Sequence, residues 1–246
     1  MSTGRFYRFL SGGKRFQTFT VQIKETDLWI AVSRRHYKPD LPAAVEQLVW
    51  RQRRLLEVFW AQNPDFAASL EPVLLHEGPV PAIAMEMVRA GNRAGVGPMA
   101  AVAGAFAEIV GLFLKNYAAE VIVENGGDLF VNTVEPVKIG IYAGKSPLSG
   151  KIAISVAPEQ TPLGICTSSG TVGHSYSRGC ADAALAISPS SPLADAAATA
   201  LGNLVRSPED LERALAYARD LEGVTGALII CGERLAAWGA IQLCPI

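Results

Sequence analysis

The most constraining stretch of this chain is the apolar run from Gly95 to Leu114, GVGPMAAVAGAFAEIVGLFL, which carries one charged residue, Glu108. About twenty apolar residues are enough for a helix to cross a bilayer. This run, however, is dominated by alanine and glycine, contains a proline and lacks the basic or aromatic flanks of a membrane span. It therefore predicts a buried core helix over about 98–116, in which Gly104 and Gly111 let another backbone approach closely.

The remaining periodicities indicate the fold class. Residues 16–33 alternate between apolar and polar side chains around a central turn, as a hairpin requires. Further strands are expected over 119–124, 129–133, 137–143, 151–157, 163–167, 183–188, 227–231 and 235–242. Helices are expected over 41–60, 63–72, 81–94, 191–205 and 207–221, from helical spacing and from Asn-Pro or Ser-Pro starts. This order predicts an α+β protein with a mostly antiparallel sheet and packed helices.

Length and charge limit the number of domains and the classes of partner. A chain of 246 residues suits one domain, here 1–246, with an N-terminal hairpin and helical block over 1–116 and a second part over 117–246. The chain has 22 basic and 23 acidic side chains, so its net charge is close to zero. The protein as a whole therefore has no electrostatic attraction for nucleic acid or an anionic membrane. The four cysteines are scattered along the chain and form no CxxC pair, which indicates free thiols. Together with an N-terminal sequence that does not resemble a secretory signal, they favour a cytoplasmic location. We therefore expect a small-molecule ligand, no nucleic acid and no membrane; the oligomeric state stays open.

The segment 163–205 is the part least explained by packing. It joins an apolar run to a polar, glycine-broken loop with several hydroxyls, one imidazole and one guanidinium, and then to a small-residue helix. Such a loop is suited to an anionic ligand. An exposed loop histidine is more often incidental than catalytic. The residues nevertheless leave a hydrolase open, with Ser168 or Cys166 as nucleophile, His174 as base and Asp182 as the orienting acid.

Two other patterns allow a structural and a chemical interpretation. Gly126 and Gly127 follow an apolar strand and permit a hairpin turn, which the spacing favours, or a loop that approaches phosphate. Asp195 and Thr199 are four residues apart on an expected helix, so both point to one face and can offer two oxygens to Mg²⁺. The structural alternative, which spacing alone favours, is that Asp195 stabilises the N-terminus of its own helix.

Four segments occur in an order that is typical of one enzyme family. ENGGDLF from Glu124 to Phe130 resembles an NxGGD motif, and TSSG from Thr167 to Gly170 resembles a T(T/S)SG segment. SPLADAAATALGN from Ser191 to Asn203 resembles an ADALATAL helix, and GPMAAVAGAFAE from Gly97 to Glu108 has the shape of a GGIAKGYAAD helix. The ordered set resembles the ApbE-like superfamily, which includes the FAD:protein FMN transferases.

That resemblance implies a T-fold-like, two-lobed α+β protein that binds Mg²⁺ and FAD or another phosphate-bearing ligand, with a protein as the acceptor. By the same resemblance, Asp195 and Thr199 would bind the metal. The flavin nucleotide would lie against two motif segments, whose residues are Asn125, Gly126, Gly127, Asp128, Thr167, Ser168, Ser169 and Gly170.

Three departures from the family pattern affect the expected chemistry. Ala103 stands where the family has a lysine, and Glu108 replaces an aspartate. The HxxDPxTG motif is absent, although His174 lies at about its place with Arg178 four residues on. We therefore expect a divergent offshoot of the superfamily in which His174 and Arg178 are catalytic and face the reacting group. A non-catalytic binding or scaffold protein on the same fold and the hydrolase remain as alternatives.

Overall fold

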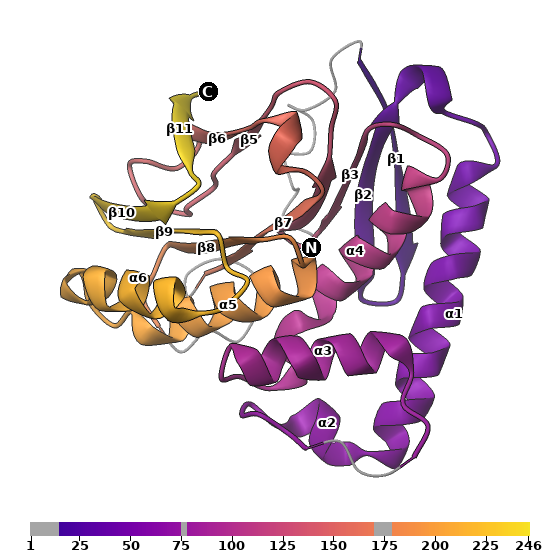
Figure 1. The fold of residues 1–246 in the computed structure, drawn as a ribbon, viewed down its shortest axis with the longest axis horizontal. Helices are drawn as coiled ribbons and strands as arrows, with labels where there is room; N and C mark the ends of the chain where they lie inside the picture. The colour runs from indigo at the N-terminus through magenta and orange to yellow at the C-terminus, as the bar shows by residue number, and fades with distance from the viewer. Residues whose placement is uncertain (1–14, 75–77, 170–178) are drawn as a thin grey trace.

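The computed structural model describes residues 15–74, 78–169 and 179–246 (Figure 1). The strands of the larger sheet are β1 (Phe16–Ile23), β2 (Thr26–Ser33), β3 (Val121–Asn125), β4 (Asp128–Asn132), β7 (Leu163–Ser168), β8 (Ala183–Ser188), β9 (Gly226–Cys231) and β10 (Arg234–Gly239). Those of the smaller sheet are β5 (Val137–Gly140), β6 (Ile152–Val156) and β11 (Gln242–Pro245). The helices are α1 (Leu41–Gln62), α2 (Pro64–Ala68), α3 (Ala82–Arg93), α4 (Val102–Lys115), α5 (Ser191–Leu204) and α6 (Leu211–Asp220), with short 3₁₀ turns between some of them.

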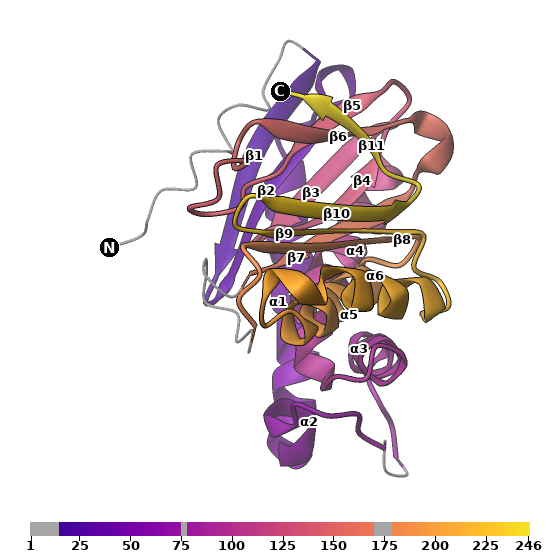
Figure 2. The same ribbon diagram turned by 90° about the vertical axis from the view of Figure 1, so that its left-hand side faces the viewer.

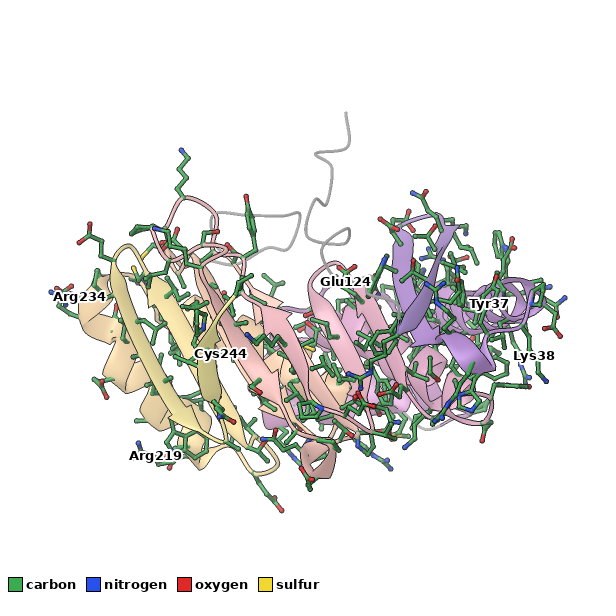
Figure 3. All side chains as sticks on the ribbon, turned by 90° about the horizontal axis from the view of Figure 1, so that it is seen from above. Tyr37, Lys38, Glu124, Arg219, Arg234 and Cys244 are labelled. Atoms are coloured by element: carbon green, nitrogen blue, oxygen red, sulfur yellow. The ribbon has the colours of Figure 1, made fainter. Side chains whose placement is uncertain are left out.

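The larger sheet has eight strands in the order β1-β2-β3-β4-β7-β8-β9-β10, and every pair in it is antiparallel. In Figure 3, Lys38 and Arg234 lie towards opposite ends of this sheet, with Glu124 between them. The pairing of β4 with β7 joins two of the motif-bearing segments. It brings the start of β4 beside the end of β7, so that two segments widely separated in the sequence meet near the middle of the sheet.

The molecule has three layers, in which the larger sheet lies between the helices and the smaller sheet (Figure 2). Strand alternation divides the side chains between the two faces. Val121, Val123 and Phe130 pack on the helices, whereas Ile122 and Val131 pack toward the smaller sheet. Because β8 and β9 are covered on both faces, all of their residues are buried, which explains their continuous apolar sequences.

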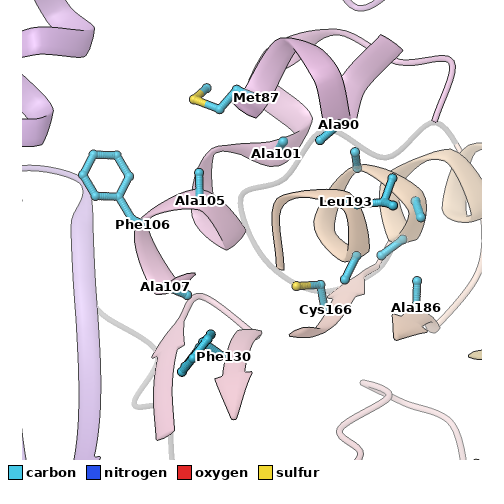
Figure 4. Close-up of a cluster of buried hydrophobic side chains, with 14 of the residues drawn as sticks. Met87, Ala90, Ala101, Ala105, Phe106, Ala107, Phe130, Cys166, Ala186 and Leu193 are labelled. Carbon is cyan, nitrogen blue, oxygen red and sulfur yellow. The ribbon is translucent and has the colours of Figure 1, made fainter. Parts of the chain in front are cut away.

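Helix α4 is a core helix. The described stretch Pro98–Lys115 has 18 residues with a mean hydropathy of 1.5, long and apolar enough to cross a membrane, and half of it is buried inside the protein. It packs against β3, β4 and α5. Figure 4 shows Ala107 of this helix beside Phe130 of β4. A Cβ on Gly111 would overlap the ring of Phe130, so this glycine makes room for an aromatic side chain, whereas close approach to another backbone was expected.

The α+β class and the antiparallel sheet are confirmed, and most predicted elements occur within a few residues of their expected bounds. One prediction was wrong: residues 235–242 do not form a single strand. The chain turns at Gly239, with φ 85°, where a Cβ would overlap the carbonyl oxygen of Thr225, and it then crosses from the larger sheet to the smaller one. The N-terminal hairpin shares a sheet with β3, but the organisation into one domain and the cytoplasmic location stay predictions.

We expect Gly111→Ala to destabilise the protein by about 1–3 kcal/mol, because the added methyl group meets a ring that is 2% exposed and cannot move aside. Chemical denaturation measures this loss. The control is Leu112→Ala on the same helix, where the side chain is 48% exposed and the expected cost is below about 1 kcal/mol. Equal losses in the two variants would contradict the close contact between α4 and β4.

Candidate functional site

The β3–β4 connection is a two-residue hairpin turn. Asn125 pairs with Asp128 across it, and Gly126 and Gly127 occupy the turn with φ angles of 73° and 110°. Glycine adopts both angles without strain, and at 110° few other residues do, so the glycine pair suits this turn. The Glu124 carboxylate accepts a hydrogen bond from the N–H of Gly127 at 2.8 Å. The hairpin interpretation is therefore confirmed, and it leaves Asp128 as the first residue of β4.

Helices α4 and α5 cap each other. The Asp195 Oδ2 atom on α5 accepts a hydrogen bond from the N–H of Gly104, 2.8 Å away in the first turn of α4. The Glu108 Oε2 atom on α4 accepts one from the N–H of Ser191, the first residue of α5, at 2.6 Å. A Cβ on Gly104 would overlap the carbonyl oxygen of Ser191, so this glycine permits the contact. Figure 1 shows the two helices converging near the middle of the molecule.

This arrangement corrects the structural alternative for Asp195. A carboxylate stabilises a helix N-terminus by accepting its free N–H groups and by opposing the helix dipole. Asp195 does so for α4, not for its own helix as the sequence suggested. Its own helix instead receives the Ser190 hydroxyl and the Glu108 carboxylate at its N-terminus.

Asp128 and Asp195 form a buried acid pair. Their residues are 7% and 9% exposed, and each carboxylate accepts a backbone N–H: Asp128 that of Thr167 at 3.2 Å, and Asp195 that of Gly104. Burial raises the pKa of Asp128 to about 7. Burial, followed by repulsion from the Asp128 charge, raises the pKa of Asp195 well above its ordinary value. Two carboxylates therefore lie close enough to repel each other in a site with little water.

Two hydroxyl groups near the acid pair have no partner. The side-chain oxygens of Ser168 and Ser191 are buried without a hydrogen bond. By strand alternation, Ser168 projects to the helix side of the sheet with Cys166, the side on which Asp128 also lies. Ser191 begins α5, and its carbonyl oxygen accepts a hydrogen bond from the Cys166 thiol at 3.5 Å. Buried polar groups are normally paired, so the Ser168 oxygen is available to a ligand, whereas the Ser191 hydroxyl lies against the Glu108 carboxylate and partly offsets the rise in its pKa that burial causes.

The donor set fits Mg²⁺. That ion prefers hard oxygen ligands and usually takes one or two carboxylates, completing its shell with water and substrate phosphates. Asp195 supplies a carboxylate, Asp128 a second one, and Thr199 a half-buried hydroxyl one turn along α5. Within the described ranges, no three or more His, Cys, Asp and Glu side chains gather as a metal cluster. A site with few protein ligands is the kind that Mg²⁺ uses and that zinc does not.

The structure brings together only part of the predicted site. Asn125 donates its side-chain N–H to the carbonyl oxygen of Ala103 at 3.2 Å, which ties the hairpin turn to α4. Thr167 contributes its backbone N–H, and Ser169 follows the end of β7. Gly170, His174 and Arg178 lie outside the described residues, so their proposed roles stay predictions.

Cys166 and Glu108 belong to the site although sequence reasoning assigned them other roles. Burial and the nearby carboxylates Asp128 and Asp195 raise the pKa of the Cys166 thiol well above its ordinary value. A thiol in that state is a poor nucleophile, which argues against the cysteine form of the hydrolase. Glu108 caps α5, and burial also raises the pKa of its carboxyl group. The signal available for Glu108 was its position as the single charge in the apolar run.

Comparison with known proteins identifies the family. The family model described as AbpE bacteria matches residues 8–235. The chain belongs to this family. A UPF0280 protein of Methanocella arvoryzae is 41% identical to it over 231 residues, covering 92% of this chain and 89% of that relative. A UPF0280 protein of Methanosarcina acetivorans is 40% identical over 225 residues, covering 89% of this chain and 85% of that relative.

Solved structures show the same fold at low sequence identity. The flavin transferase ApbE from Vibrio cholerae has a TM-score of 0.54 and 13% identity, covering 91% of this chain and 96% of that one. The apo form of the flavinyl transferase ApbE from Pseudomonas stutzeri has a TM-score of 0.52 and 17% identity, covering 91% and 94%. The resemblance to the ApbE-like superfamily that the motifs indicated is therefore confirmed for family and fold.

The acid pair predicts an unusual pH dependence for the metal-free protein. The pKa of Asp128 is raised to about 7 in the folded state. Its contribution to the free energy of unfolding is therefore fully present below the pKa of the same group in the unfolded chain, about 4, and is lost as pH rises through about 7. Asp195 acts in the same direction. We expect urea denaturation in the presence of a chelator to show that Asp128 lowers the free energy of unfolding by about 2–3 kcal/mol between pH 5 and pH 8.

The Asp128→Asn variant should remove most of that loss, because the amide carries no charge at either pH. Glu46→Gln, which changes an exposed charge on α1, serves as the control and should keep the wild-type profile. If the Asp128→Asn and wild-type proteins lost the same free energy between the two pH values, the buried acid pair would not be the cause.

Proposed function

We propose that this protein binds a flavin nucleotide with Mg²⁺ and transfers its FMN part to a protein hydroxyl group. The observation that carries the proposal is the buried acid pair, Asp128 and Asp195, at the N-terminus of α4. Each carboxylate accepts backbone N–H groups, and the two repel each other. A divalent cation between them and a phosphate would remove that repulsion.

Each part of the site has a role in this proposal. Asp195 and Thr199 would hold the metal, and Asp128, whose charge raises the pKa of Asp195, would share it. The N–H groups of Gly104 and Ser191 at the ends of α4 and α5 already donate to Asp195 and Glu108, so a pyrophosphate would be held through the metal rather than by these N–H groups. The free hydroxyl of Ser168 offers that ligand a hydrogen bond. Bound Mg²⁺ would supply charge neutralisation on the pyrophosphate and on the group that leaves.

The chemistry at the reacting phosphate depends on residues that differ from the family pattern. Ala103 carries no charge, and its carbonyl oxygen is occupied by the Asn125 amide. We propose that Arg178 supplies the cation that the family takes from its lysine, and that His174 removes the proton from the acceptor hydroxyl. FAD, the flavin ligand of the family, is the expected substrate, and a threonine or serine of another protein is the expected acceptor.

A second candidate function is ligand binding without transfer. The observation that favours it is the same uncharged position, because a neutral Ala103 supplies no cation for a phosphate and the Gly104 N–H beside it already donates to Asp195. Such a site binds an anion but stabilises a transferring phosphoryl group less than a cation does. The two functions share the ligand and the metal, and they differ in whether an acceptor is modified.

We expect calorimetry to show that Mg²⁺ strengthens FAD binding at least tenfold, a change of about 1.4 kcal/mol, and that Asp195→Asn removes this gain. The asparagine oxygen can still accept the Gly104 N–H, so the cap on α4 survives. The metal-free variant should therefore melt no lower than the wild-type protein, since a buried, repelled charge is lost. Glu46→Gln is the exposed control. A variant that bound Mg²⁺ and FAD as well as the wild-type protein would exclude Asp195 from the metal site.

The transfer step is tested by mass spectrometry of an acceptor. A peptide library with central threonine or serine residues, incubated with the protein, FAD and Mg²⁺, should gain the mass of one FMN group, with AMP released. Magnesium-free reactions and the Asp195→Asn protein serve as controls. If FAD binds with Mg²⁺ and no peptide or endogenous protein gains mass, the binding function replaces the transferase.

A further inference from the structure

Two cysteines form a pair outside the acid site. The Sγ atoms of Cys180 and Cys231 lie 3.9 Å apart although the residues are 51 positions apart in the chain. Cys180 precedes β8, and Cys231 is the last residue of β9, the strand that pairs with β8. The role proposed above for the acid pair uses neither of them.

The backbone on both sides of this pair is held in place. The N–H of Cys180 donates to the carbonyl oxygen of Val205 at 2.8 Å. The N–H of Asp182 donates to the carbonyl oxygen of Ile230 at 2.9 Å, and the Asp182 side chain accepts the N–H of Gly232 at 2.8 Å. These bonds hold the main chain at and after Cys180 and on both sides of Cys231. The two sulfur atoms therefore stay neighbours, and the shift that a bond requires, from 3.9 Å to about 2.05 Å, falls on side-chain rotation.

The two thiols differ in exposure. Cys180 is exposed, whereas Cys231 is buried. Burial, followed by the hydrogen bond with Cys180, raises the pKa of the Cys231 thiol to about 11, and Asp182 and Glu209 add to this effect. An external disulfide therefore reacts with Cys180 first. Cys231 is shielded from the solvent and reacts only with a group that is already attached to Cys180. This is the division between an attacked and a resolving cysteine.

We propose that Cys180 and Cys231 form a reversible disulfide by exchange with a small disulfide such as oxidised glutathione. The Cys180 thiolate attacks one sulfur of the reagent, and its S–S bond breaks to release one small thiolate. The Cys231 thiol then loses its proton and attacks the Cys180 sulfur, which releases the second small thiolate. In total two protein thiols are oxidised, one small disulfide is reduced to two thiols, and the protein loses two hydrogen atoms.

The bond would close a segment of the chain that contains β8, α5, α6 and β9. That segment contains Asp195, so oxidation would join the two ends of the segment that provides one carboxylate of the acid pair. Closing a loop of this length restricts the unfolded chain. We expect the oxidised protein to melt about 5 °C higher than the reduced one.

The test uses the full chain, first reduced and then equilibrated in glutathione buffers of increasing oxidised fraction, with a chelator present throughout. Intact mass should show the loss of two hydrogen atoms, and peptide mapping should join the fragments that contain Cys180 and Cys231. Cys244→Ser, which changes a partly buried thiol hydrogen-bonded to the Ala153 carbonyl oxygen, is the matched control and should oxidise like the wild-type protein.

Single variants separate the two steps. Cys231→Ser should accumulate a glutathione adduct on Cys180, and Cys180→Ser should form neither the adduct nor the bond. Because Cys180 is exposed, its serine variant should fold, which circular dichroism checks. The proposal is overturned if the wild-type protein keeps a glutathione adduct on Cys180 as Cys231→Ser does. It is also overturned if both thiols stay reduced in fully oxidising buffer, or if the bond joins two molecules.

Discussion

The contact between the N-terminal ends of α4 and α5 determines much of this structure. Two helix ends with partial positive charge meet where Gly104 lets the Ser191 backbone come close. Their approach would be unfavourable without compensation. Glu108 and Asp195 provide it, because each helix supplies a carboxylate to the other. The arrangement ties the two helices to each other on the sheet, and it places Asp195 near Asp128 at the start of β4.

The position of Asp195 creates an electrostatic conflict with the sheet. The turn at Gly126 and Gly127 makes Asp128 the first residue of β4, on the helix side. Asp128 therefore faces a region that already holds a carboxylate, and burial raises the pKa of both groups. A fold selected for stability alone would replace one of the two acids by a neutral residue. Retaining both fits a site in which a bound cation resolves the conflict.

Local patterns predicted those features of the fold that depend on neighbours in the sequence. The glycine pair predicted the hairpin turn, and the Ser-Pro start predicted α5. The split of β10 from β11 was missed because it depends on the close approach of Gly239 to the Thr225 carbonyl group, which leaves no room for a Cβ. The caps were missed for the same reason, since they join residues 91 and 83 positions apart. Alternation and turn chemistry contain no information about such pairs.

The site residues divide in the same way. The ApbE-like motifs pointed to Asp128 and Asp195, which the fold brings together, but not to Cys166 or Ser191, which owe their place to the crossing of β7 by α5. The neutral Ala103 is also understandable only in three dimensions. Its carbonyl oxygen binds the Asn125 amide, and its N–H faces the Asp195 carboxylate. This position therefore contributes backbone groups to the candidate site, so any full positive charge that the proposed transfer requires must come from another residue or from a metal ion.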